Sequence, residues 1–171
     1  KFRINNKNFK EGQAFDESGS TAVFVVIHGD GKHVYCGSVG DSEVIACKAG
    51  VPWEKSVASV LPTHKPDTDK ARIEASGGLV RHGRICFPGT TAPTLSVSRA
   101  FGDLHFKSGA VFEDPNGEQW ELKLDQVMAE PSVARLSLDD TELIVLASDG
   151  LWDYFSPQRT VAFIKREIRT S

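Results

Sequence analysis

The chain has 171 residues, and its 40% hydrophobic content is enough to bury one sizeable core. Its 20 basic and 23 acidic residues are interspersed and give a formal net charge of -3, which argues against nucleic acid or an anionic membrane as a partner. No apolar run approaches the ~20 residues that span a bilayer, and the asparagine-rich start lacks the apolar centre of a signal peptide. We therefore expect an intracellular globular protein, cytoplasmic or nuclear, without membrane insertion.

The first part of the chain predicts antiparallel strands. Residues 1–18 are polar and indicate a loop or the tail of an earlier segment. A β-branched run over 19–27 is reversed by Gly29-Asp30-Gly31 into a second strand over 33–39, which predicts a hairpin. A third strand is expected over 43–48, so the pattern predicts a meander. Cys36, Cys47 and Cys86 lack metal-ligand spacing and are expected to be buried free thiols.

Two helices are indicated further along. The first is expected over 67–76, with Asp67 or Thr68 as its N-cap and Gly77-Gly78 as its stop. The second begins at Ser156, a good N-cap, and carries an apolar face made by Val161, Ile164 and Ile168. Between prolines 62 and 66, His64 is interpreted as an oriented surface residue or a packing residue rather than a ligand.

The stretch from Leu143 to Asp153 is the candidate site. Five successive apolar residues over 143–147 predict a strand buried on both faces, which ends where Asp149 and Gly150 begin. Asp-Gly is also a common turn, so this pair alone favours a turn. Asp153 lies four residues on, however, and a turn or short helical step would aim both carboxylates into one oxygen-rich pocket suited to a hard cation.

Three other polar features have structural alternatives. Asp41 is expected to cap a turn rather than to bind metal. Arg99 could meet a phosphate, but an ion pair with Asp103 is favoured. The segment over 109–124 is polar and irregular, and it is expected to be a flap-like loop in which Trp120 either contacts substrate or covers the loop's own core.

Seven sequence blocks resemble, in order, the motifs of the metal-dependent protein serine/threonine phosphatases of type 2C. The blocks are Gly19-Ser20-Thr21-Ala22, Val39-Gly40-Asp41-Ser42, His64-Lys65-Pro66, Arg72-Ile73 with Gly77-Gly78, Ser98-Arg99-Ala100-Phe101-Gly102-Asp103, Glu130-Pro131 and Ala147-Ser148-Asp149-Gly150-Leu151-Trp152-Asp153. The resemblance implies an α+β fold, an antiparallel β-sandwich flanked by helices in four layers (α-β-β-α).

The resemblance also implies the chemistry. Family members hydrolyse phosphoserine and phosphothreonine in proteins with a water that bridges two Mg²⁺ or Mn²⁺ ions, so no side-chain nucleophile is needed. Asp149 matches a metal-bridging carboxylate, and Asp153 matches a residue that helps to hold a third, weaker ion. A phosphoprotein is the implied partner.

Several family features are absent. The early Asp-Gly-His-Gly-Gly motif and the C-terminal Asp-Asn motif do not occur, and Thr63 stands where a third-metal aspartate is common, which predicts a weakened third site. Glu43 replaces the usual arginine after Gly40-Asp41-Ser42. Residues 1–171 are therefore expected to form one partial phosphatase domain, incomplete at both ends and inactive alone, with no catalytic residue assigned beyond the metal ligands. The alternatives are an inactive phosphatase-like binding or regulatory domain, or an unrelated α+β binding domain.

Overall fold

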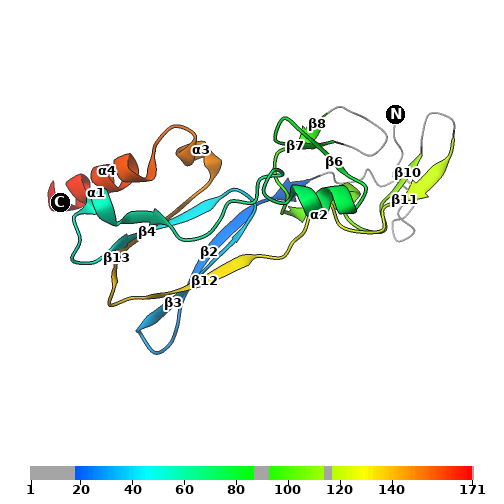
Figure 1. Cartoon of the computed structure of the whole chain (residues 1–171). Helices are drawn as coiled ribbons and strands as arrows, with labels where there is room; N and C mark the ends of the chain where they lie inside the picture. Colours follow the sequence, from blue (N-terminus) through cyan, green and yellow to red (C-terminus); the bar gives the residue numbers. More distant parts are fainter. Residues whose placement is uncertain (1–17, 87–92, 114–116, 171) are drawn as a thin grey trace. The chain divides into compact units, whose positions relative to one another are not determined.

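The computed structural model describes residues 18–86, 93–113 and 117–170 (Figure 1). Contacts within the chain separate it into two compact units, one of residues 22–63 with 131–171 and one of residues 1–21 with 64–130. Residues 1–17, 87–92, 114–116 and 171 lie outside the described residues, and with them almost all of the loop or tail expected over 1–18.

The unit built from 22–63 and 131–171 contains two three-stranded antiparallel sheets. The first has the order β12-β3-β2 and consists of β12 (Ser132–Ser137), β3 (His33–Val39) and β2 (Ala22–Ile27). The second has the order β13-β4-β5 and consists of β13 (Thr141–Ala147), β4 (Glu43–Lys48) and β5 (Val57–Ser59). The predicted strands are confirmed, but the predicted meander is wrong, because the chain changes sheets between β3 and β4. Gly40, with φ 95°, makes the turn there.

A hydrophobic core joins the apolar faces of these two sheets. Cys36 of β3 and Val44 of β4 are both fully buried in one cluster. Side chains from four further strand and loop segments pack against them: Val23, Val25, Val60, Leu61, Ala134, Leu136 and Ile144. The sandwich of two antiparallel sheets is therefore present in this unit.

The three cysteines of the chain, Cys36, Cys47 and Cys86, are buried free thiols, as predicted.

Helices cover one outer face of the sandwich. Val161 of α4 (Pro157–Thr170) packs with Ile45 and Cys47 on the outer face of β4, and α4 also lies against β5 and α1 (Trp53–Ser56) (Figure 1). The outer face of the other sheet carries side chains that are more than a third exposed: Phe24, Val26, Tyr35 and Val133. Among the described residues this unit thus has three layers (β-β-α), and the fourth layer of the expected arrangement is not formed by them.

The start of α4 agrees with the sequence pattern. The Ser156 hydroxyl accepts a hydrogen bond from the backbone N–H of Arg159 (3.3 Å), and the Ser156 carbonyl accepts one from Thr160 (3.0 Å). Val161 is fully buried, but Ile168 is 67% exposed, so the expected apolar face of the helix does not extend that far among the described residues.

Replacing Ser156 with Ala is expected to lower the free energy of unfolding by about 1 kcal/mol, since one N–H at the helix start loses its acceptor. Chemical denaturation of the two proteins measures this difference. Ser156→Asp is the matched control, because its carboxylate keeps the acceptor and suits the positive end of the helix. Equal losses in both variants would show that the cap bond is unimportant.

The other unit consists of smaller elements around a separate core. Its sheets are β1 (Gly19–Ser20) with β9 (Phe101–Gly102), the three-stranded β6 (Leu79–Arg81), β7 (Arg84–Cys86) and β8 (Pro93–Leu95), and the hairpin of β10 (Val111–Glu113) and β11 (Gln119–Glu121). Helix α2 (Lys70–Ala75) and the 3-10 helix η1 (Leu104–Phe106) complete it. Ile73 of α2 packs on Val80 and Ile85, and Phe106 joins the same cluster.

Helix α2 differs from the sequence expectation at its start. It begins at Lys70, with Asp69 rather than Asp67 or Thr68 in the N-cap position, and the Asp69 side chain makes no capping bond. The predicted stop is confirmed: the N–H groups of Gly77 and Gly78 donate to carbonyls of the last turn, and Gly77 has φ +83°, a conformation that suits glycine.

The segment over 109–124, expected to be an irregular loop, contains the β10–β11 hairpin with a small core of its own, made by Ala110, Phe112 and Leu122. Backbone bonds join Gly109 and Ala110 to Leu122. The backbone of Trp120 pairs with Phe112, but its side chain is outside the described part of the structure, so both interpretations of Trp120 remain predictions. No helix in the described ranges is long and apolar enough to cross a membrane.

Candidate functional site

Asp149 lies directly after the end of β13, as predicted. The strand ends at Ala147, Ser148 is the N-cap of α3 (Asp149–Trp152), and the Trp152 indole N–H donates to the Ala147 carbonyl (2.8 Å), which fixes the short helix to the strand end. The predicted burial on both faces is wrong, because no residue of β13 is fully buried and Leu146 is 38% exposed.

Asp153 follows Asp149 by one helical turn. The Asp153 N–H donates to the Asp149 carbonyl (2.8 Å), and residues spaced by four on a helix share a face. Both residues are exposed, so neither carboxylate has to be desolvated before it meets an ion. Glu43 adds a further carboxyl-bearing residue at this end of the sheet, since it is paired with Ala147 in the β4–β13 register.

This arrangement fits part of the ligand set of a hard divalent ion. Mg²⁺ keeps several waters and is commonly held by one or two carboxylates, which is what Asp149 and Asp153 offer. In the described part of the chain, no three His, Cys, Asp or Glu side chains are already arranged around one ion position. Asp149 and Asp153 thus fit part of the ligand set of a metal centre. Water or other segments would supply the remaining ligands.

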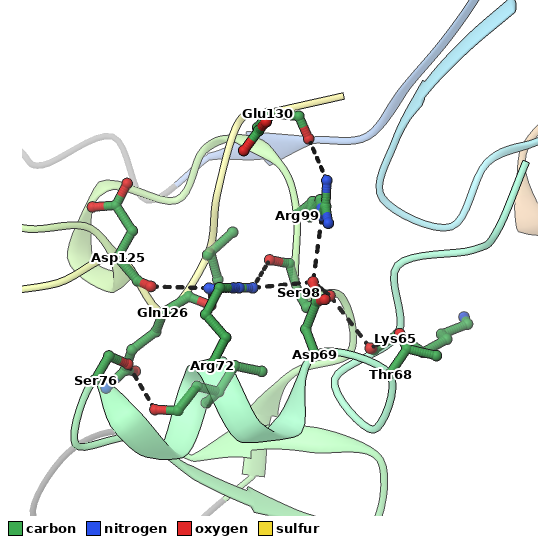
Figure 2. Close-up of polar contacts among 12 residues, drawn as sticks. Lys65, Thr68, Asp69, Arg72, Ser76, Ser98, Arg99, Asp125, Gln126 and Glu130 are labelled. Carbon is green, nitrogen blue, oxygen red and sulfur yellow. Dashed lines mark hydrogen bonds and ion pairs between the residues drawn. The ribbon is translucent and has the colours of Figure 1, made fainter. Parts of the chain in front are cut away.

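A second polar cluster surrounds Asp69, at the N-terminus of α2 (Figure 2). Its Oδ2 accepts a hydrogen bond from the Ser98 hydroxyl (2.8 Å) and ion-pairs with Arg72 Nη2 (3.1 Å) and Arg99 Nε (3.4 Å). Arg99 therefore does form an ion pair, but its partner is Asp69 and the predicted pairing with Asp103 is wrong.

The two arginines extend this cluster to backbone carbonyls. Arg72 donates to the carbonyls of Asp125 (2.9 Å), Gln126 (3.1 Å) and Ser98 (3.0 Å). Arg99 Nη1 donates to the Glu130 carbonyl (2.9 Å), as Figure 2 shows. The cluster fastens α2 to two chain segments that lie 26 or more positions further along the sequence.

Asp69 is held in its charged form. Burial acts to raise the pKa of its carboxyl group, but the hydrogen bond from Ser98 and the charges of Arg72 and Arg99 outweigh burial, so the pKa lies below its usual value. The contacts of this cluster join α2 to other segments of the same unit. We therefore assign the cluster a structural role, that of holding this unit together.

The other singled-out residues are buried or half-buried. His64 is 3% exposed and its carbonyl accepts the N–H of Ser98 (2.9 Å), so it is not the surface residue that was one of the two expected alternatives to a ligand. Asp41 is 7% exposed, and the neighbouring Ser38 hydroxyl donates to the Ser42 carbonyl (2.9 Å) across the same turn. Thr63 is half-buried.

Comparison with known proteins identifies the class. The family model of protein phosphatase 2C matches residues 1–171, and the chain belongs to this family. Protein phosphatase 2C 57 of Arabidopsis thaliana is 32% identical over 92% of the chain, and protein phosphatase 2C homolog 2 of Schizosaccharomyces pombe is 35% identical over 90% of it.

A solved structure supports the same assignment. The serine-threonine phosphatase 2C of Toxoplasma gondii has 25% sequence identity and a TM-score of 0.64, with 91% of this chain covered. The chain spans 42% and 37% of the lengths of the Arabidopsis and S. pombe relatives and 49% of the Toxoplasma chain.

Proposed function

We propose that residues 1–171 are part of one catalytic domain of a metal-dependent protein phosphatase that hydrolyses phosphoserine and phosphothreonine in proteins. The observation that carries the proposal is the placement of Asp149 at the end of β13, with Asp153 one turn later, in a chain of the protein phosphatase 2C family. Both are exposed carboxylates in the family motif that the resemblance assigns to metal binding.

When bound, two Mg²⁺ or Mn²⁺ ions would acidify the attacking water and neutralise the phosphoryl oxygens. In this proposal Asp149 would help to hold these ions. Asp153 would help to hold a third ion, and only weakly, because Thr63 offers a neutral hydroxyl where a carboxylate would offset the cost of dehydrating the ion. The Trp152–Ala147 hydrogen bond keeps the helix that carries both carboxylates at the strand end.

The second candidate is a catalytically inactive phosphatase-like domain that binds partners. Thr63 and Glu43, which depart from the family pattern, favour it. A dead relative would have no need of Asp149 and Asp153, and their retention favours the enzyme. A longer version of the protein assayed on a phosphopeptide with Mn²⁺ separates the two, because only the enzyme turns over.

The 171-residue chain alone is expected to be inactive even if the whole protein is an active enzyme. Two divalent ions bring four positive charges, and Asp149 and Asp153 balance only part of them. A positioned general acid, which the missing histidine motif would supply, is worth ~10²–10⁴-fold in rate. Hydrolysis of a chromogenic phosphomonoester with excess Mn²⁺ should therefore be barely detectable beside the full-length protein. Metal-dependent turnover within about tenfold of it would place the active site elsewhere.

Trp120 in the β10–β11 hairpin is proposed to contact substrate. Aromatic residues are favoured anchors at interfaces, so Trp120→Ala in the full-length protein should raise KM for a phosphopeptide and leave kcat on a small phosphomonoester unchanged. Gln119→Ala, in the same strand, is the matched control. A lower melting temperature without any change in KM would instead assign Trp120 to covering the hairpin's own core.

A further inference from the structure

Two histidines occupy opposite backbone positions where the β2–β3 hairpin closes. The His28 N–H donates to the His33 carbonyl (2.9 Å) and the Gly31 N–H donates to the His28 carbonyl (3.1 Å), so residues 29–32 form the loop. Gly31, with φ +67°, takes the left-handed conformation in this turn. Residues opposite one another in an antiparallel pair have side chains on the same face, which brings the two imidazoles together.

The Asp30 carboxylate lies between the two rings, and backbone N–H groups bind one of its two oxygens. Its Oδ1 accepts the backbone N–H groups of Lys32 (2.8 Å) and His33 (3.1 Å), which fixes the carboxylate. Its Oδ2 is left to face both imidazoles, at 2.7 Å from His33 Nδ1 and 3.1 Å from His28 Nδ1. The hydrogen bond with His33 first, and then the backbone bonds, hold the pKa of Asp30 well below its usual range, so the carboxylate is charged at neutral pH.

The cluster thus places three Lewis bases within reach of one another. His28 Nδ1 is also 3.3 Å from the Asp30 N–H and accepts from it, so its lone pair is directed toward the loop. Ligand atoms that each lie ~2.1 Å from one Zn²⁺ ion are about 3.0 Å apart at a right angle and about 3.4 Å apart at the tetrahedral angle. The two N–O distances in the hairpin are near the lower value, and a proton now occupies the position between His33 Nδ1 and Asp30 Oδ2.

We propose that His28, Asp30 and His33 bind a Zn²⁺-like ion at the tip of the β2–β3 hairpin. Imidazole nitrogens favour ions such as Zn²⁺, Co²⁺ and Ni²⁺, whereas Mg²⁺ favours oxygen ligands, so this ion differs in class from those proposed for Asp149. Binding replaces the hydrogen bond from His33 Nδ1 to Oδ2, and the one that His28 Nδ1 accepts from the Asp30 N–H, with bonds to the ion. A neutral His33 keeps its proton by carrying it on Nε2, and a protonated one releases it to solvent.

The solvent exposure of the three side chains allows them to exchange their hydrogen bonds for bonds to the ion. The side chains of Asp30 and His33 are each 35% exposed and that of His28 is 57% exposed, so water can complete the coordination and the rings can turn. Some rotation of the three side chains is needed, because hydrogen bonds now hold them and they are not arranged around one ion position. The Tyr35 ring meets the His28 ring edge-on at 6.2 Å and limits how far it turns.

Titration calorimetry of the full-length protein with Zn²⁺, in excess Mg²⁺ and with Asp149→Asn in the background, tests the site. One Zn²⁺ per chain is expected, with affinity lowered by at least about tenfold in His33→Gln and in Asp30→Asn. His82→Asn, which removes an exposed histidine from another hairpin, is the matched control and should bind as the parent does. Absence of binding, or equal affinity in His33→Gln and the parent, would overturn the proposal. Neither result bears on the proposed phosphatase, because the Asp149 ligand is already removed.

Discussion

Replacing Asp149 with Asn is expected to lower the phosphatase activity of the full-length protein by orders of magnitude while the fold persists. The change removes one negative charge and one strong oxygen donor from the proposed centre, which would hold two divalent ions. Because the residue is exposed at the end of β13, its loss leaves the cores of the sandwich untouched. Steady-state kinetics on a phosphopeptide over a range of Mn²⁺ concentrations measure the effect.

The matched control for this variant is Asp139→Asn. Asp139 is also an exposed aspartate of the same unit, in the turn between β12 and β13, and its replacement should leave both kcat and the Mn²⁺ requirement unchanged. Thermal unfolding of both variants should match that of the parent. Near-normal turnover in Asp149→Asn would remove the residue from the metal centre.

Replacing Asp69 with Ala should be the most destabilising of the proposed polar changes. The variant leaves two guanidinium groups and the Ser98 hydroxyl without their shared acceptor, and the loss of a partly buried charged partner costs about 2–3 kcal/mol. Urea denaturation measures it. Asp67→Ala is the control, since Asp67 is exposed two residues earlier and its loss should be nearly neutral. A small effect at both positions would show that the cluster contributes little.

The stability that Asp69 contributes should depend on pH. Its pKa is lower in the folded protein than in the unfolded chain, so its contribution is complete above the unfolded value, about 3.9. The contribution is lost as the pH falls from there through the lower folded value. The difference in unfolding free energy between the parent and Asp69→Asn should accordingly be constant near neutrality and shrink in acid. A difference independent of pH down to about 3 would contradict the ionic role.

Local patterns were sufficient to predict the elements that depend on neighbouring residues. The β-branched run over 22–27, the glycine turn after it and the N-cap at Ser156 each require only nearby residues, and each is found in the structure. The position of Asp149 was predictable for the same reason, because an apolar run that stops at a polar pair marks the end of a strand.

Features that depend on distant residues were missed. The Asp69 cluster joins residues that are 26 to 54 positions apart, and from the sequence Arg99 was expected to pair with the nearby Asp103 instead. The separation of Asp69 and Arg72 by three residues was the one local signal, because it allows an ion pair along α2. Likewise, nothing local distinguishes a turn within one sheet from the turn at Gly40 that leads into the other sheet.

The most direct measurement of whether Asp149 holds a catalytic ion is the anomalous scattering of Mn²⁺ in crystals of the full-length protein. A Mn²⁺ peak is predicted within bonding distance of an Asp149 carboxylate oxygen, about 2.0–2.3 Å, with a second peak nearby bridged by the same carboxylate. Mn²⁺ bound only at positions away from Asp149, in crystals that hydrolyse a phosphopeptide, would contradict the assignment.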